Sequence, residues 1–238
     1  MMLPAALRPD GALKLVIFDC DGVLIDSEGP SCRMIARSLR EHGRTISDED
    51  AVHRFAGHAL TALKHEIEQA EGITLPADWP AQMQRNLVSL MRNEAETIEG
   101  APAMLRGVAA LGLPYRIGSN SSVQEMEAKF GRTGLDALIV PTCIHSARDM
   151  GCPKPDPAVY LAAAQAQGVP PGECIVLEDT ETGARAARSA GMGCVLLRSA
   201  ELPAPSWPGL LCIAHLDEFV PLLRQIMASQ RGDANGNG

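Results

Sequence analysis

The sequence predicts an α/β fold in which helices cover a parallel sheet and a small all-helical segment is inserted near the N-terminus. The apolar run at residues 15–18 leads directly into acidic side chains and is typical of a buried parallel strand. Strand-like and helix-like segments then alternate between residues 97 and 228, and this alternation favours a parallel sheet. Residues 27–96 are charged and helix-like with few apolar runs, so they form the predicted insertion.

The insertion is predicted to contain three amphipathic helices, at residues 31–42, at residues 60–72, and from residue 78 through residue 91 or beyond. The last of these begins at Asp78-Trp-Pro, because Pro80 suits the first turn of a helix. We therefore expect an α/β core at residues 13–26 and 97–228 and a helical domain at residues 27–96. The polar, glycine-rich tail at residues 229–238 is expected to be disordered.

The later alternation of strands and helices predicts a Rossmann-like core. The expected strands after residues 15–18 are 115–119, 137–140, 174–178, 193–197 and 211–214. The expected helices are 101–111, 123–131, 157–167, 181–190 and 216–227. In a parallel sheet all of these strands end at the same edge.

Composition excludes several classes of protein. A net charge of −8 and an aromatic content of 3% argue against a nucleic-acid partner. There is no apolar stretch of 18 residues to span a membrane, and residues 1–10 lack the apolar core of a secretory signal. The seven cysteines are scattered and include no Cys-x-x-Cys pair, which favours free thiols in a cytoplasmic protein. We expect a monomer or a weak homo-oligomer.

Two carboxylates, Asp19 and Asp21, directly follow the strand at residues 15–18. Carboxylates this close repel each other unless a cation or a shared proton lies between them. Ligands of open α/β sheets bind at the carboxyl ends of the strands, which is where this pair is expected. The pair therefore predicts a divalent metal, a carboxylate nucleophile, or both.

Other chemically active side chains follow later strands and are expected at the same edge of the sheet. They are Ser119 and Asn120, Glu178 and Asp179, and Lys154, which lies between two prolines in the loop after residues 137–140. Asp19 and Asp179 can bind Mg²⁺, which prefers one or two carboxylates together with water and phosphate oxygens. Lys154 and Ser119 can then offset and hydrogen-bond the charged oxygens of a phosphoryl group. Asp21 can protonate a leaving oxygen and later activate water, while an aspartyl-phosphate forms as the covalent intermediate.

Four segments in this order resemble the motifs of the haloacid dehalogenase-like hydrolases. They are Phe18-Asp-Cys-Asp-Gly-Val-Leu, Ser119-Asn, Lys154-Pro-Asp-Pro and Glu178-Asp, and the resemblance covers residues 13–228. Asp-x-Asp-Gly also begins calcium-binding loops, but no helix precedes Asp19 as such a loop requires. The helical insertion resembles the branch with a small helical cap, which contains β-phosphoglucomutases, phosphoglycolate phosphatases and small sugar-phosphate phosphatases.

The resemblance implies a role for each matching residue. Asp19 resembles the nucleophile and a metal ligand, and Asp21 resembles the acid/base, with its backbone carbonyl on the metal. Asp179 resembles the second metal carboxylate, and Glu178 lies near the metal or acts on it through water. Ser119, Asn120 and Lys154 resemble the phosphate-binding residues. In the cap, His58 lies where relatives place a specificity loop, and Arg54 and Lys64 are further candidates for contact with an anionic substrate.

The resemblance implies a Mg²⁺-dependent phosphatase that hydrolyses a small phosphorylated metabolite, such as a sugar phosphate or a sugar-acid phosphate. The opening motif also resembles bacterial 6-phosphogluconate phosphatases. The alternative is a β-phosphoglucomutase-like phosphotransferase. Those mutases carry a histidine where this chain has Ser31, and an arginine shortly after the cap-loop glycine, where this chain has His58-Ala-Leu. Both departures favour the phosphatase, and the complete set of acids argues against a binding module without activity.

Overall fold

The computed structural model describes residues 3–55, 60–199 and 201–234, and the chain divides into two compact units. The first unit joins both ends of the chain, Met1–Ile25 and Thr97–Gly238. The second unit is the stretch between them, Asp26–Glu96. A two-stranded sheet of β2 (Ile25–Asp26) and β3 (Glu96–Thr97) occurs where the chain passes from one unit to the other.

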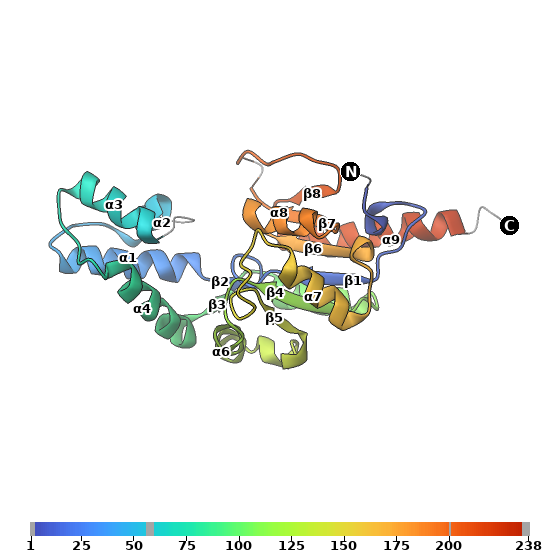
Figure 1. The fold of residues 1–238 in the computed structure, drawn as a ribbon, viewed down its shortest axis with the longest axis horizontal. Coiled ribbons are helices and arrows are strands. Elements are labelled where there is room, and N and C mark those ends of the chain that lie inside the picture. The colour runs from blue at the N-terminus through green and yellow to red at the C-terminus, as the bar shows by residue number, and fades with distance from the viewer. Residues whose placement is uncertain (1–2, 56–59, 200, 235–238) are drawn as a thin grey trace. The chain divides into compact units, whose positions relative to one another are not determined.

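The first unit contains a six-stranded parallel sheet, which confirms the predicted α/β class (Figure 1). Its strand order is β5-β4-β1-β6-β7-β8, so β1, which Asp19 directly follows, lies inside the sheet between β4 and β6. The chain leaves β1 toward β4 on one side and later returns to β6 on the other, and a reversal of this kind creates a binding crevice at the strand ends. The strands are β1 (Leu15–Phe18), β4 (Tyr115–Ser119), β5 (Ile144–Ser146), β6 (Cys174–Glu178), β7 (Gly193–Leu197) and β8 (Leu210–Ile213).

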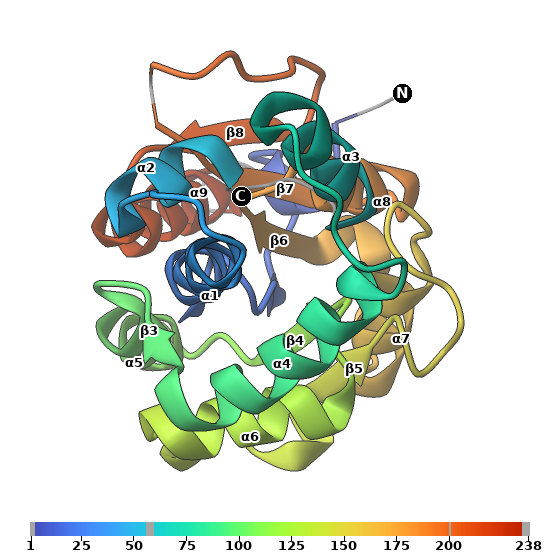
Figure 2. The ribbon, with the colours of Figure 1, turned by 90° about the vertical axis from the view of Figure 1, so that its left-hand side faces the viewer.

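Helices cover both faces of this sheet, with α7 and α8 on one side and α5 and α9 on the other (Figure 2). Their bounds are α5 (Ala101–Ala110), α6 (Val123–Thr133), α7 (Ala158–Gln167), α8 (Glu181–Ser189) and α9 (Phe219–Ala234). Short 3₁₀ helices occur at η1 (Ala5–Leu7), η2 (Leu135–Ala137), η3 (Pro141–Cys143), η4 (Pro171–Glu173) and η5 (Leu216–Glu218).

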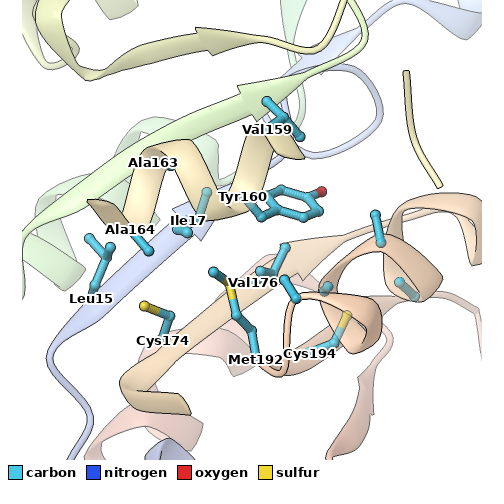
Figure 3. Close-up of a cluster of buried hydrophobic side chains, with 14 of the residues drawn as sticks. Leu15, Ile17, Val159, Tyr160, Ala163, Ala164, Cys174, Val176, Met192 and Cys194 are labelled. Carbon is cyan, nitrogen blue, oxygen red and sulfur yellow. The ribbon is translucent and has the colours of Figure 1, made fainter. Parts of the chain in front are cut away.

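Strand β1 is buried on both faces, as its unbroken apolar run predicts. Leu15 and Ile17 point into a cluster built with Tyr160 of α7 and Val176 of β6 (Figure 3). Phe18 belongs to the opposite face, where its ring lies 5.9 Å from the ring of Phe219 in α9. The packing on both sides fixes the position of the residue that follows, Asp19.

The expected strand at residues 137–140 is wrong. The 3₁₀ helix η2 ends at Ala137 and residues 138–140 form no strand, while the edge strand is instead β5, whose residues Ile144–Ser146 pair with Ile117–Ser119 of β4. The hydroxyl of Tyr115 donates to the carbonyl of Leu138 at 2.7 Å, and Pro141 has no backbone N–H to offer a neighbouring strand. The apolar residue Ile139 still enters the core, but it does so from a turn.

The C-terminal helix α9 is longer than expected, and the expectation of disorder is wrong for residues 229–234. Gln230 explains why the helix continues, because it bonds to the N-terminal segment. Its side-chain oxygen accepts from the backbone N–H of Leu13 at 3.0 Å, and its amide donates to the carbonyl of Ala6 at 3.0 Å. The remainder of the expected tail, residues 235–238, lies outside the described residues.

The second unit is helical, and the three expected helices are present as α1 (Glu28–Glu41), α3 (Leu60–Glu71) and α4 (Trp79–Glu94). They share a buried core, in which the indole N–H of Trp79 donates to Ser38 Oγ at 3.0 Å. A further helix, α2 (Asp48–Phe55), was not expected. The sequence feature that indicates the start of this helix is Ser47, whose hydroxyl oxygen caps it by accepting from the N–H of Asp50 at 3.0 Å.

Two expectations from composition are consistent with this structure. All seven cysteines are free. Across the described part of the chain, no helix combines the length and the apolar character that a membrane span requires.

Candidate active site

The centre of the site is the ammonium group of Lys154, which lies between two carboxylates. Its Nζ donates to Asp19 Oδ1 at 2.7 Å and to Glu178 Oε1 at 2.8 Å. All three side chains are less than 10% exposed. Asp19 follows β1 and donates its own N–H to the carbonyl of Leu177 at 2.9 Å, so the sheet ladder continues into the site. The structure thus brings together three predicted residues from two strand ends and one loop.

Asn120 and Ser119 lie directly beside this centre at the end of β4. The side-chain oxygen of Asn120 accepts from the backbone N–H of Lys154 at 2.9 Å, so Asn120 holds the lysine loop against β4. Ser119 is 1% exposed, and its Oγ accepts from the N–H of Ser121 at 3.0 Å. Asn120 therefore has a structural role that the sequence did not predict, in addition to its expected role in phosphate binding.

Glu178 uses both of its carboxylate oxygens on donors from the protein. Oε1 accepts from Lys154 and from the hydroxyl of Tyr160 at 2.9 Å, while Oε2 accepts from the N–H of Asp179 at 3.0 Å. Oε2 also accepts from the backbone N–H of Thr180 at 2.9 Å and from its hydroxyl at 2.8 Å. These five bonds fix Glu178 as the anion that orients Lys154. Tyr160 and Thr180 were not among the predicted residues, because nothing in their local sequence distinguishes them.

The charges of this cluster are strongly coupled. Burial would raise the pKa of Glu178, but the Lys154 ammonium and the Thr180 donors outweigh it and hold that pKa below its usual value. Burial would lower the pKa of Lys154, but Asp19 and Glu178 hold it above its usual value, so the ammonium stays charged. For Asp19, burial dominates over the attraction of Lys154, and the pKa of this carboxyl is raised. The ammonium of Lys154 therefore offsets the burial of Glu178 but not that of Asp19.

The residues present fit a divalent metal ion. Asp19, Glu178 and Asp179 each offer an oxygen, and these three atoms lie within 4.8 Å of one another. A divalent cation would add positive charge at a place where the ammonium of Lys154 alone lies between the carboxylates of Asp19 and Glu178. A set of hard oxygen ligands suits Mg²⁺. Because both oxygens of Glu178 already accept hydrogen bonds, Asp19 and Asp179 are the better candidates for direct ligation.

The glycine of the Asp-x-Asp-Gly motif is required by a close approach. Gly22 has φ = 80°, a left-handed conformation that favours glycine. A Cβ atom at this position would lie 1.9 Å from Asp179 Oδ2. Only glycine lets the loop after β1 pass this close to the candidate metal ligand.

Asp21 is held by two side chains that the sequence analysis missed. Ser121 Oγ donates to Asp21 Oδ2 at 2.7 Å, and Lys129 Nζ donates to Asp21 Oδ1 at 2.7 Å. Lys129 is 5% exposed although it lies on helix α6, whose pattern suggests a charged outer face. The two acids of the Asp-x-Asp-Gly motif therefore accept hydrogen bonds from different lysines, Asp19 from Lys154 and Asp21 from Lys129.

Comparison with known proteins identifies the family. The protein-family model described as haloacid dehalogenase-like hydrolase matches residues 13–191, which include all four motif segments. The chain belongs to the haloacid dehalogenase-like hydrolases. The resemblance stated from the motifs is thereby confirmed.

Similar members of this family include two enzymes of Escherichia coli K12. The 6-phosphogluconate phosphatase is 33% identical over 181 residues, which cover 76% of this chain and 80% of that protein. Hexitol phosphatase A is 31% identical over 216 residues, which cover 89% of this chain and 95% of that protein. Among solved structures, a HAD family hydrolase from Deinococcus radiodurans R1, with bound phosphate and sodium, aligns with a TM-score of 0.76. Its identity is 28%, and the alignment covers 90% of this chain and 96% of that one.

The three predicted specificity residues belong to the second unit. Arg54 pairs with Glu71 at 3.0 Å, and Lys64 pairs with Glu68 at 2.7 Å, so both cations have partners within their own unit. His58 lies outside the described residues. The role of all three in substrate recognition stays a prediction.

The packing of Glu178 against helix α8 provides a test of the site. A Cβ atom at Gly183 would lie 1.6 Å from Glu178 Oε1. The Glu178 carboxylate cannot move away easily, because its two oxygens accept five hydrogen bonds. We expect Gly183→Ala to destabilise the fold by about 1–3 kcal/mol, as overpacking of a core does. Equilibrium unfolding in urea measures the change.

Gly131→Ala is the matched control, because Gly131 is also helical and a Cβ atom there meets nothing within 4 Å. This variant is expected to gain roughly 0.5–1 kcal/mol from the better helix propensity of alanine. Equal stability of the two variants would contradict the close approach of Glu178 to α8.

Proposed function

We propose that this chain is a Mg²⁺-dependent phosphatase that hydrolyses a small phosphorylated metabolite, such as a sugar phosphate or a sugar-acid phosphate. The observation that carries the proposal is the meeting of Asp19, Lys154, Glu178 and Asp179 at the carboxyl edge of the sheet. The names of the relatives, a 6-phosphogluconate phosphatase and a hexitol phosphatase, support this class of substrate.

In this proposal Asp19 is the nucleophile. Its carboxylate attacks phosphorus, the bond from phosphorus to the leaving oxygen breaks, and that oxygen takes a proton from the Asp21 carboxyl. Water then attacks the aspartyl-phosphate and gives its proton to Asp21. The acyl-phosphate P–O bond breaks, which restores Asp19 and releases inorganic phosphate.

Other residues hold the charge that develops on the phosphoryl group. Lys154 and Ser119 lie at the strand edge where they can bind its oxygens, and both are fixed in advance by their bonds to Glu178 and Ser121. Asp19 and Asp179 would hold Mg²⁺, with Glu178 acting through Lys154 or a water molecule. When bound, the ion offsets the repulsion between the Asp19 carboxylate and the phosphate.

The helical second unit, Asp26–Glu96, is proposed to be a cap that recognises the rest of the metabolite. Arg54, His58 and Lys64 are the candidates for that contact.

The experiment that tests the function is a screen of the full chain with Mg²⁺ against phosphorylated sugars, sugar acids and polyols, with phenyl phosphate and p-nitrophenyl phosphate as general probes. A phosphatase releases inorganic phosphate from at least one of them. A mutase would need a bisphosphate primer and would yield an isomerised sugar phosphate. A binding module would yield neither product and would refute the proposal.

Removal of the metal gives a second test of the site. We expect chelation by EDTA to abolish phosphate release and Mg²⁺ to restore it. Asp179→Asn is expected to weaken Mg²⁺ binding by at least about tenfold, because a neutral amide replaces one of the ligand carboxylates. Isothermal titration with Mg²⁺ measures the affinity independently of turnover.

Asp136→Asn makes the same exchange on an exposed side chain of η2 and should leave the affinity unchanged. Equal affinities in the two variants would remove Asp179 from the metal site.

A further inference from the structure

Lys129 is a buried cation that belongs to none of the four motifs. Its side chain is 6% exposed, and burial of an ammonium group is costly unless the group is paired. Its Nζ lies 2.7 Å from Asp21 Oδ1 and 3.0 Å from Ser121 Oγ. Burial would lower the pKa of Lys129, but Asp21, together with Cys20 and Glu125, holds it above its usual value.

Asp21, Ser121 and Lys129 form a closed triangle of hydrogen bonds. Ser121 Oγ donates to Asp21 Oδ2 at 2.7 Å while it accepts from Lys129. A donor therefore reaches each carboxylate oxygen of Asp21, one from the loop after β4 and one from α6. This arrangement fixes the rotation of the carboxylate as well as its position.

The helix that carries Lys129 is firmly anchored beside the site. Its N-terminus is a capping box, in which Ser122 Oγ accepts from the N–H of Glu125 at 3.2 Å and Glu125 accepts from the N–H of Ser122 at 2.8 Å. Glu125 also pairs with Arg148 at 2.9 Å, which ties the start of α6 to the loop after β5. Lys129 thus approaches Asp21 from a rigid element.

We propose that Lys129 is a positioning residue that directs Asp21 toward the leaving oxygen of the substrate. The inference rests on the proposed phosphatase function and deepens it. The ammonium of Lys154 is already bound by Asp19 and Glu178, so Lys129 gives Asp21 a separate cation. Lys129 separates the two acids, so that Asp19 attacks phosphorus while Asp21 serves the leaving group. Lys129 itself touches neither substrate nor metal in this role.

The test is the dependence of the rate on the leaving group. Phenyl phosphate and p-nitrophenyl phosphate have similar shapes, but nitrophenolate departs readily without protonation, whereas phenolate needs the proton from Asp21. The ratio kcat/KM reports the steps up to that departure. Lys129→Met should lower kcat/KM for phenyl phosphate by about 10- to 100-fold, and for p-nitrophenyl phosphate by about threefold or less.

Lys14→Met is the matched control, since Lys14 precedes β1 at the opposite end from Asp19 and pairs with Glu173 at 2.9 Å. It should leave both values of kcat/KM unchanged. In the Asp21→Asn background, adding Lys129→Met should lower kcat/KM for phenyl phosphate little further, because the lysine acts through Asp21. If Lys129→Met fails to fold, Ser121→Ala removes the third member of the triangle and should shift the leaving-group dependence in the same direction.

Equal losses for the two aryl phosphates in both variants would overturn the proposal, because a purely structural defect does not distinguish leaving groups. Additive losses in the Asp21→Asn background would also overturn it. Failure of the wild-type chain to release phosphate from any probe would instead refute the proposed function.

Discussion

Replacing Asp19 with asparagine is expected to abolish phosphate release, with a loss of at least about 10³-fold in kcat. The amide has no carboxylate oxygen that can attack phosphorus, and it also removes one charge from the candidate metal site. The fold should survive, because the amide oxygen can still accept the bond that Lys154 donates to Asp19 Oδ1 at 2.7 Å. Phosphate release and a thermal melt followed by circular dichroism measure the two effects separately.

The same variant tests the covalent step directly. Acid quenching of the wild-type protein during turnover should trap a phosphorylated chain that intact-mass spectrometry detects, and digestion should place the modification at Asp19. The Asp19→Asn chain should show no such species. The exposed Asp136→Asn variant serves as the control and should behave as the wild type does. Normal turnover by Asp19→Asn would exclude Asp19 as the nucleophile.

Sequence reasoning located the core of this site because the chemistry is carried by strand ends. A run such as residues 15–18 identifies its own strand, and parallel pairing brings the ends of β1, β4 and β6 to one edge. The wrong strand at residues 137–140 did not disturb this inference. The true strand, β5, also ends before Lys154, so the lysine loop still begins at the same edge.

Residues that act through contacts between distant segments could not be predicted in this way. Lys129 and its partner Asp21 are 108 positions apart, and nothing in the sequence of α6 marks one charged side chain as buried. Tyr160 reaches Glu178 from α7 in the same manner. Such pairs depend on how helices pack on the sheet, which hydrophobic periodicity indicates only as a face and not as an individual contact.

The role of the glycines could be predicted from the sequence only in part. Gly22 belongs to the motif, but its physical reason, the approach of Asp179, became visible only with the structure. Gly183 carries no motif of its own, although its lack of a side chain is what lets Glu178 lie against α8. The sequence does not distinguish Gly183 from Gly131, which is also helical but has nothing within 4 Å of its Cβ position.

Lys154→Met is expected to combine a large loss of activity with a loss of stability. Methionine has a similar length but no charge, so the phosphoryl oxygens lose a fixed cation, which corresponds to about 10²–10³-fold in kcat. The change also leaves the buried carboxylates of Asp19 and Glu178 without the ammonium between them. Breaking a buried ion pair from one side costs about 3–5 kcal/mol.

Lys14→Met provides the comparison for stability. The Lys14 side chain is 55% exposed in its pair with Glu173, and an exposed pair of this kind contributes at most about 1 kcal/mol. Urea unfolding of the metal-free proteins should therefore separate the two lysine variants clearly. Similar stabilities would mean that Lys154 is not held between two charged carboxylates.

A second change separates the two roles of Lys154. Adding Glu178→Gln to Lys154→Met removes the carboxylate that the lysine had neutralised. The amide oxygen can take the place of Oε2 and accept from Thr180, and the amide NH2, in the place of Oε1, can donate to the hydroxyl oxygen of Tyr160. The double variant should recover part of the lost stability, because fewer uncompensated charges stay buried. Its activity should remain as low as that of Lys154→Met, since no cation returns to the phosphoryl oxygens. Recovery of activity together with stability would mean that Lys154 serves only to balance Glu178, and that another group binds the phosphate.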